Sequence, residues 1–82
     1  MAKVHWRPEA ADDLDGATVF VHAGFPDVRI QPGEHTDAAG GVWPHGVQVT
    51  VRDDEHGWLP VDSGSFFWVH EAEAWAEREL AP

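Results

Sequence analysis

Two short stretches of the chain gather histidine with acidic side chains. Glu34, His35 and Asp37 form the first group, and the run Asp53-Asp54-Glu55-His56 forms the second. Imidazole nitrogens and carboxylate oxygens bind metals, but the six histidines include no His-x-x-x-His pair and cysteine is absent. The acidic run also lacks the alternating acids and terminal glutamate of a calcium loop. We expect two solvated loops, with neither a metal site nor a cofactor.

Covalent catalysis would need an activated nucleophile. Ser63 and Ser65 fall in a stretch typical of a tight turn, without the surroundings of a nucleophile elbow. Lys3 is the only lysine, and no glycine-rich phosphate loop follows a predicted strand. The pattern predicts a protein that is not an enzyme and has no catalytic residues.

The size of the chain limits it to one domain. Its 82 residues fall below the roughly 100 to 150 residues of a typical domain. Five tryptophans and four phenylalanines compensate, because each buried aromatic side chain removes roughly 150 to 250 Å² from water. Since cysteine is absent, packing must stabilise the fold without disulfides.

The charge of the chain restricts its partners. Fifteen acidic residues against five basic ones give a formal net charge of −10. Such a charge repels nucleic acid and anionic lipid and favours a basic, neutral or peptidic partner, although it would also serve simply to keep a small protein soluble. No signal peptide is recognisable, and no stretch approaches the roughly 18 apolar residues that span a bilayer. We expect a cytoplasmic or virion-associated protein that binds neither nucleic acid nor membrane.

Alternating apolar and polar residues predict the strands. The alternation is found in residues 17–22, 28–31 and 47–52, and is clearest in the last, where the valines face inward. Residues 33–41 contain three glycines and no periodic pattern, so they predict the longest loop, where binding tends to reside. Residues 53–57 predict a second, short and acidic loop.

The two ends of the chain differ from the middle. Residues 1–16 predict an N-terminal extension with a turn or one loose helical turn over the surface. Residues 70–80 have the period of a helix, with Ala72, Trp75, Ala76 and Leu80 on one stripe. A helix this short is marginal alone, so it must dock. Residues 17–69 between them predict a small all-β barrel of about five strands.

The stretch from Trp58 to Val69 predicts a hairpin with its turn at residues 62–65. Residues 66–69 are apolar on both faces of a strand, whereas a strand in a small antiparallel barrel normally has one polar face. Two explanations are open. Either Trp75 of the C-terminal helix covers the second face, or Phe67 belongs to an exposed patch that docks on a partner or on another copy of the chain.

The order of these signals resembles the bacterial SH3-like domain family over residues 27–70. Asp27-Val28-Arg29 with Pro32 resembles the family's Asn-Val-Arg-x-x-Pro motif, and Trp43-Pro44-His45-Gly46 before Val49-Thr50-Val51 resembles its Leu-x-x-Gly-x-x-Val-x-Val segment. Gly57-Trp58 with Val61, followed by Trp68-Val69-His70, is similar to its Gly-Trp-x-x-Val hairpin that ends in Gly-Trp-Val. Phe67 departs from the pattern, since the family usually has glycine there.

The resemblance implies a strongly bent five-stranded barrel that binds peptides, cell-wall peptidoglycan or proteins and does no chemistry itself. It places residues 31–42 in a long loop that faces a loop at residues 53–57, with Val61, Trp68 and Val69 as framework. Trp58 is either an aromatic residue at the rim of the groove or a core residue. The candidate partner-binding residues are Trp58, Phe67, His35, Asp54 and His56.

Three functions are compatible with the sequence. The first is a docking module for a protein or peptide, as a single chain, a homo-oligomer or a small subunit of a larger assembly such as a phage particle. The second is recognition of cell-wall peptides. The third is an acidic inhibitor whose clusters at residues 9–15, 53–55 and 71–79 imitate the phosphates of nucleic acid.

Overall fold

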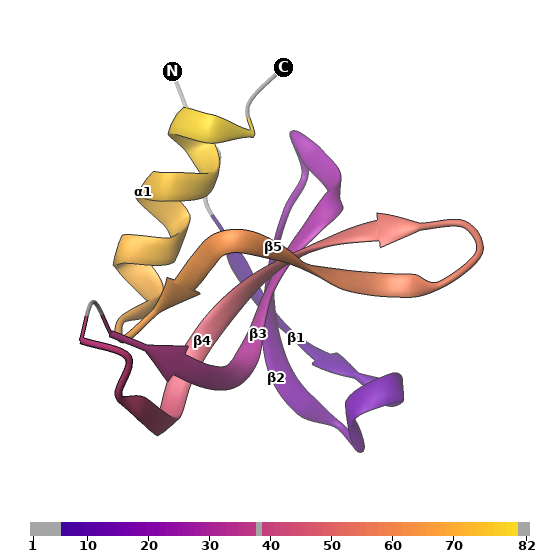
Figure 1. Ribbon diagram of the computed structural model, residues 1–82. Helices are drawn as coiled ribbons and strands as arrows, with labels where there is room; N and C mark the ends of the chain where they lie inside the picture. Colours follow the sequence, from indigo (N-terminus) through magenta and orange to yellow (C-terminus); the bar gives the residue numbers. More distant parts are fainter. Residues whose placement is uncertain (1–5, 38, 81–82) are drawn as a thin grey trace.

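A computed structural model describes residues 6–37 and 39–80, except for the side chains at positions 36, 44, 62 and 63 (Figure 1). Its strands are β1 (Arg7–Ala11), β2 (Ala17–His22), β3 (Phe25–Thr36), β4 (Val42–Asp53) and β5 (Gly57–Phe66). A 3-10 turn, η1 (Asp12–Leu14), follows β1, and a helix, α1 (Val69–Glu79), follows β5. The protein is therefore all-β with one short C-terminal helix, as the sequence predicts.

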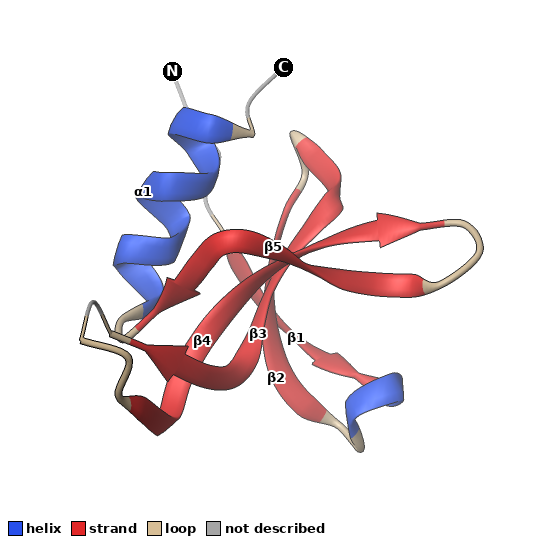
Figure 2. Cartoon of the chain, in the orientation of Figure 1, coloured by secondary structure: helices blue, strands red, loops and turns tan. Residues whose placement is uncertain are grey.

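The five strands form one antiparallel sheet in the order β1-β2-β3-β4-β5 (Figure 2). Each strand pairs with its neighbours in the sequence, and the long β3–β4 ladder runs from Val28 opposite Val51 to Thr36 opposite Val42. In the described residues β1 and β5 lie at the edges of the sheet, and the ladders do not join them. The predicted number of strands is confirmed, and closure into a barrel stays a prediction.

The predicted hairpin within residues 58–69 is wrong, because both of its halves pair with β4. Gln48 lies opposite Ser65 and Thr50 lies opposite Pro60, so residues 61–64 bulge out across from Val49. A bulge bends a strand and increases its twist, and β5 arches over the sheet at this point (Figure 1). At Gly64 a Cβ atom would lie 3.2 Å from the Val49 Cβ. The turn-forming residues therefore make a bend rather than a hairpin turn.

The predicted long loop is also mostly strand. Residues up to 36 belong to β3 and residues from 42 belong to β4, with His35 opposite Trp43, so only residues 37–41 connect the two strands. The predicted acidic loop at 53–57 is confirmed in its centre: residues 54–56 form the β4–β5 turn, and Gly57 follows with a φ of 76°. The left-handed backbone at this position favours glycine.

The N-terminal extension is partly a strand. Residues 7–11 pair with β2, from Arg7 opposite Val21 to Ala11 opposite Ala17, so they are not a loose segment. The segment predicted as a turn or one loose helical turn contains η1, and residues 1–5 of the extension lie outside the described residues. The backbone at Gly16 has a φ of 82° and directs the chain into β2. Pairing with a neighbouring strand, rather than apolar periodicity, defines β1.

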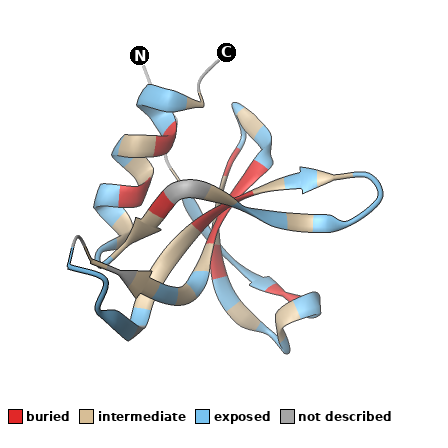
Figure 3. Ribbon diagram, viewed as in Figure 1, coloured by how far each residue is buried: buried red, intermediate tan, exposed pale blue. Residues whose placement is uncertain are grey.

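The core lies between α1 and one face of the sheet (Figure 3). Ala72 and Ala76 of the helix are fully buried, and they lie four residues apart on the stripe that the sequence predicts. Small side chains let the helix approach the sheet closely. The buried sheet residues in this cluster are Val28, Ile30 and Val49, and the partly buried residues that pack against it include Trp6, Phe20, Phe25, Val47, Val51, Val61, Phe66, Trp75 and Leu80.

Candidate functional site

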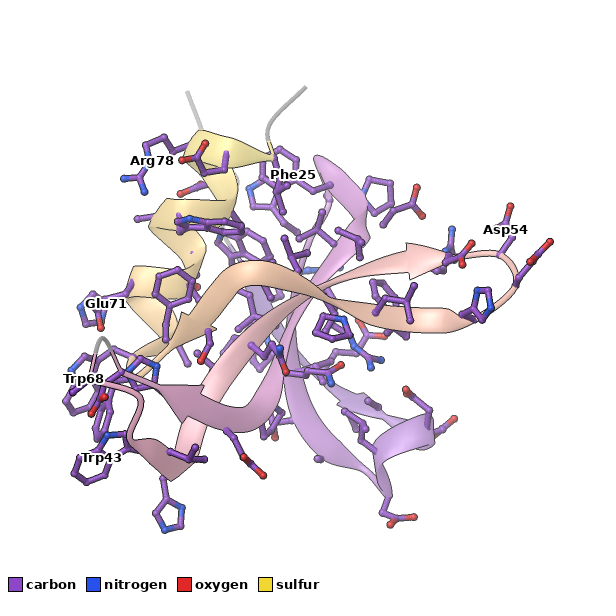
Figure 4. The ribbon with its side chains drawn as sticks, in the orientation of Figure 1. Phe25, Trp43, Asp54, Trp68, Glu71 and Arg78 are labelled. Carbon is purple, nitrogen blue, oxygen red and sulfur yellow. The ribbon has the colours of Figure 1, made fainter. Side chains whose placement is uncertain are left out.

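Among the residues that the structure describes, four of the five exposed large hydrophobic side chains come from two segments, the start of β4 and the junction between β5 and α1. Trp43 is 49% exposed, Phe67 is 43% exposed and Trp68 is 58% exposed. Ring contacts join these three side chains to His35 and His70. We call these five residues the aromatic patch. Trp43 and Trp68 lie together on one side of the molecule in Figure 4.

Phe67 is at the centre of the aromatic patch. Its ring centroid lies 5.9 Å from that of His35, 6.1 Å from that of Trp43 and 5.3 Å from that of Trp68. All three contacts are edge-to-face, an arrangement that the ring quadrupoles favour. His70 stacks on Trp68 at 6.4 Å, with 21° between the ring planes. The patch is therefore a connected set of rings rather than scattered apolar side chains.

Asp37 positions Trp43. The Trp43 indole N–H donates a 3.0 Å hydrogen bond to Oδ2 of Asp37, while Oδ1 accepts from the backbone N–H groups of Ala39 and Gly41 at 3.0 and 2.8 Å. These bonds, that from Trp43 foremost, lower the pKa of Asp37 below its ordinary value because they favour the charged form. A Cβ at position 41 would lie 2.9 Å from Oδ2 of Asp37, so glycine permits this close approach. The loop carboxylate thus fixes an exposed tryptophan.

Ser65 positions His35. The Ser65 hydroxyl donates to the carbonyl oxygen of Glu34 at 3.1 Å, and its oxygen lies 3.2 Å from Nδ1 of His35. These contacts connect β3 to β5 across β4. They require Gly46 between them, since a Cβ there would lie 2.7 Å from the His35 Cβ and 2.8 Å from the carbonyl oxygen of Phe66. The three strands are held close together beneath the patch.

The sequence left open whether the helix covers Phe67, and the structure shows that it does not. Phe66 packs against Trp75, with 5.7 Å between ring centroids. Phe67 is instead exposed and contacts the other rings of the aromatic patch. Val61 packs against the core, as the sequence predicts. The prediction that Trp68 is framework is wrong: β5 ends at Phe66, and Trp68 is at the N-cap position of α1.

The five predicted binding residues fall into three places. His35 and Phe67 meet in the aromatic patch. Asp54 and His56 belong to the β4–β5 turn, where Nδ1 of His56 lies 2.6 Å from Oδ2 of Asp53. Figure 4 shows Asp54 on the opposite side of the molecule from the labelled patch residues. The structure therefore does not bring the two predicted loops together into one groove.

Trp58, the fifth predicted residue, contacts Arg29. The Arg29 guanidinium lies 4.5 Å from the centroid of the Trp58 ring and is only 5% exposed. It also donates two 3.0 Å hydrogen bonds to the Asp13 carboxylate and others to Oε1 of Gln31. The Arg29 bond lowers the pKa of Asp13. Arg29 lies opposite Thr50 and next in sequence to core residues, so this polar cluster is on the sheet face away from the core.

Trp43, Trp68 and His70 are the patch residues that the sequence analysis did not assign to the site. Trp43 follows the predicted loop directly, and Trp68 adjoins Phe67 in the doubly apolar segment. These neighbours in the sequence were the signals that could have assigned the two tryptophans to the site. Their contact through Phe67 depends on β3–β4 pairing and on the point where β5 ends, because these bring positions 43 and 67 together.

Two acidic residues adjoin the aromatic patch. Asp37 accepts the hydrogen bond of the Trp43 indole, and Glu71 follows His70 in the first turn of α1. The described arginines in ion pairs contact acids outside the patch: Arg29 pairs with Asp13, Arg52 with Asp27 and Arg78 with Glu79. The aromatic patch therefore combines exposed rings with neighbouring negative charge.

The remaining acidic residues are distributed over separate elements. The clusters predicted at residues 9–15, 53–55 and 71–79 fall on β1 with η1, on the β4–β5 turn and on α1. Within residues 6–37 and 39–80, no three histidine or acidic side chains gather closely enough to hold a metal ion. The helices of this part of the chain include none that is long and apolar enough to cross a membrane.

Neither a family model nor a curated protein nor a solved structure matches this chain. The resemblance to bacterial SH3-like domains therefore stays an expectation that rests on the quoted motifs.

Proposed function

We propose that this protein is a non-catalytic docking module that binds a protein or peptide partner through the aromatic patch. The observation that carries the proposal is the exposure of Trp43, Phe67 and Trp68 by 49, 43 and 58% while their rings form one connected cluster. Soluble proteins rarely expose such contiguous apolar groups outside interaction sites. Tryptophan is also enriched among the residues that dominate binding energy at interfaces.

The hydrogen bonds beneath the aromatic patch support this proposal. Asp37 holds the Trp43 indole, and Ser65 lies against the His35 ring. Side chains that are already held in position lose less conformational entropy when a partner binds. An aromatic residue left at the surface only by chance would not require such support.

Partner capture with matched variants tests the proposal. The wild-type protein, Trp43→Ala, Trp68→Ala and the control Leu59→Ala are immobilised and exposed to an extract of the producing cells. Leu59 is 39% exposed but lies on β5 outside the aromatic patch. We expect a partner that the wild type and Leu59→Ala retain and that both tryptophan variants lose. Equal retention by all four proteins, or no retained partner, would contradict the proposal.

Association of two copies of this chain through the aromatic patch is less favourable than binding of a partner that carries no large negative charge. Each carries a formal charge of −10, and a face-to-face contact would bring Asp37 and Glu71 of both copies close together. Like charges at such a contact oppose association most strongly at low ionic strength. We expect sedimentation at low salt to show a monomer. A dimer that Trp68→Ala dissociates would instead identify a second copy as the partner.

A further inference from the structure

The acidic residues beside the aromatic patch favour a positively charged group on its partner. We infer that the patch receives an arginine or lysine side chain from a peptide segment of the partner, an inference that rests on the proposed function. Exposed aromatic rings attract cations through their negative faces when the cation lies within about 6 Å of the ring centroid, and tryptophan attracts them best. Trp43 and Trp68 provide two such rings in one connected cluster.

Asp37 adds a hydrogen-bond acceptor beside these rings. A carboxylate oxygen accepts two hydrogen bonds. Oδ1 accepts from Ala39 and Gly41, and Oδ2 accepts from Trp43. Among the hydrogen bonds of the described residues, Oδ2 therefore retains one acceptor position next to the Trp43 indole. A guanidinium or ammonium group that lies on the indole ring could donate to it, and charge-assisted bonds of this kind are the stronger ones.

The described part of the protein itself contains an arrangement of this kind. Arg29 lies 4.5 Å from the centroid of the Trp58 ring while it donates to the Asp13 carboxylate. This internal cluster thus combines a tryptophan face, a guanidinium and an aspartate. The aromatic patch has the tryptophan and the aspartate at the surface, joined by the bond between Trp43 and Asp37, and contains no arginine or lysine of its own.

Net charge favours the same partner. The described ion-paired arginines contact Asp13, Asp27 and Glu79, away from the patch. These three arginines therefore place no positive charge beside Trp43 and Trp68. The formal charge of −10 would accelerate the encounter with a cationic segment, an effect that salt weakens.

Two synthetic peptides that differ only in charge test the inference. The first is Gly-Arg-Gly-Arg-Gly, and the second replaces each arginine by citrulline, which keeps the shape and loses the positive charge. Each is titrated into the full-length protein at low salt, and the indole N–H resonances of the tryptophans are followed by NMR. Trp58 and Trp75, which contact Arg29 and Phe66, serve as internal references.

We expect the arginine peptide to shift the resonances of Trp43 and Trp68 and leave those of Trp58 and Trp75 in place. Its Kd should be at least threefold lower than that of the citrulline peptide, which corresponds to about 0.7 kcal/mol at ~1.4 kcal/mol per tenfold change. One exposed cation–π contact contributes about that much. Glu71→Gln, which removes a neighbouring charge but no ring, should weaken arginine-peptide binding in the same direction.

Failure of this inference is distinguishable from failure of the docking function. Equal affinity for both peptides, or no shift of the resonances with either peptide, overturns the inference that the patch receives a cationic side chain. The docking function then still stands if Trp43→Ala loses the partner that Leu59→Ala retains in the capture experiment. Shifts of Trp58 or Trp75 that equal those of Trp43 would place peptide binding elsewhere and also overturn the inference.

Discussion

The indole N–H of Trp43 donates a 3.0 Å hydrogen bond to Oδ2 of Asp37, so a loop carboxylate sets the position of an exposed tryptophan. The other oxygen of the same carboxylate closes the loop through two backbone N–H groups. One ionised side chain therefore links the backbone of the β3–β4 loop to an exposed ring of the aromatic patch.

The first prediction concerns the pH dependence of this bond. Hydrogen bonding lowers the pKa of Asp37 below its ordinary value of 3.8. A lowered pKa in the folded state stabilises the fold above the unfolded value, and that contribution is lost as pH falls through the folded pKa. The Trp43 indole resonance should stay constant while Asp37 is ionised and should shift with a midpoint below 3.8. A midpoint above that value, assigned to Asp37, would contradict the bond.

The second prediction separates the two adjacent phenylalanines. Phe66 packs against the core and Trp75, whereas Phe67 is 43% exposed. We expect Phe66→Ala to lower the free energy of unfolding by about 3 kcal/mol and Phe67→Ala to lower it by about 1 kcal/mol. Urea denaturation measures both. Phe67→Ala should remain folded and lose the partner, and an unfolded Phe67→Ala protein would instead make this side chain part of the core.

The third prediction concerns the close approach of strands beneath the patch. Gly46→Ala would place a methyl group 2.7 Å from the His35 Cβ and 2.8 Å from the Phe66 carbonyl oxygen. Overpacking of this kind typically costs about 1 to 3 kcal/mol. Gly33 is the matched control: it lies opposite Gly46 in the β3–β4 ladder, and a Cβ there would have its nearest contacts at 3.4 Å.

We therefore expect Gly33→Ala to change the free energy of unfolding by less than about 1 kcal/mol, and Gly46→Ala also to shift the His35 ring resonances. Thermal denaturation and NMR spectra of both variants provide the comparison. Equal stability of the two variants would show that the strands can separate at position 46 without cost.

The fourth prediction concerns the polar cluster on the sheet face away from the core. Arg29 is buried, forms an ion pair with Asp13 and lies over the ring of Trp58. Arg29→Ala should lower the free energy of unfolding by about 2 to 3 kcal/mol, because it removes both the paired charge and the packing of the arginine stem. Arg29→Lys should recover only part of this loss, since lysine cannot donate two parallel bonds to a carboxylate.

Urea denaturation of the two variants measures these effects. Asp13→Asn serves as the comparison: Asp13 is 54% exposed, so its replacement should destabilise the protein less than Arg29→Ala does. A larger effect from Asp13→Asn would show that the carboxylate, rather than the buried arginine, carries the stability of the cluster.

Local patterns in the sequence were sufficient for several elements. The alternation in residues 17–22 and 47–52 corresponds to strands, and the stripe that contains Ala72 and Ala76 is the buried side of α1. These features depend on periodicity within one segment, so they can be read without knowledge of its partners. The fold class, all-β with a C-terminal helix, follows from them.

The partners of each segment were decided by the tertiary structure. Residues 62–65 suit a hairpin turn and a bulge equally well, and only the length of β4, which pairs with both halves of β5, selects the bulge. The site has the same origin. Exposed aromatic residues at positions 43, 67 and 68 become one patch because strand pairing and the end of β5 bring them together. The sequence determined that aromatic residues are in excess, while the non-local pairing of strands determined which of them reach the surface.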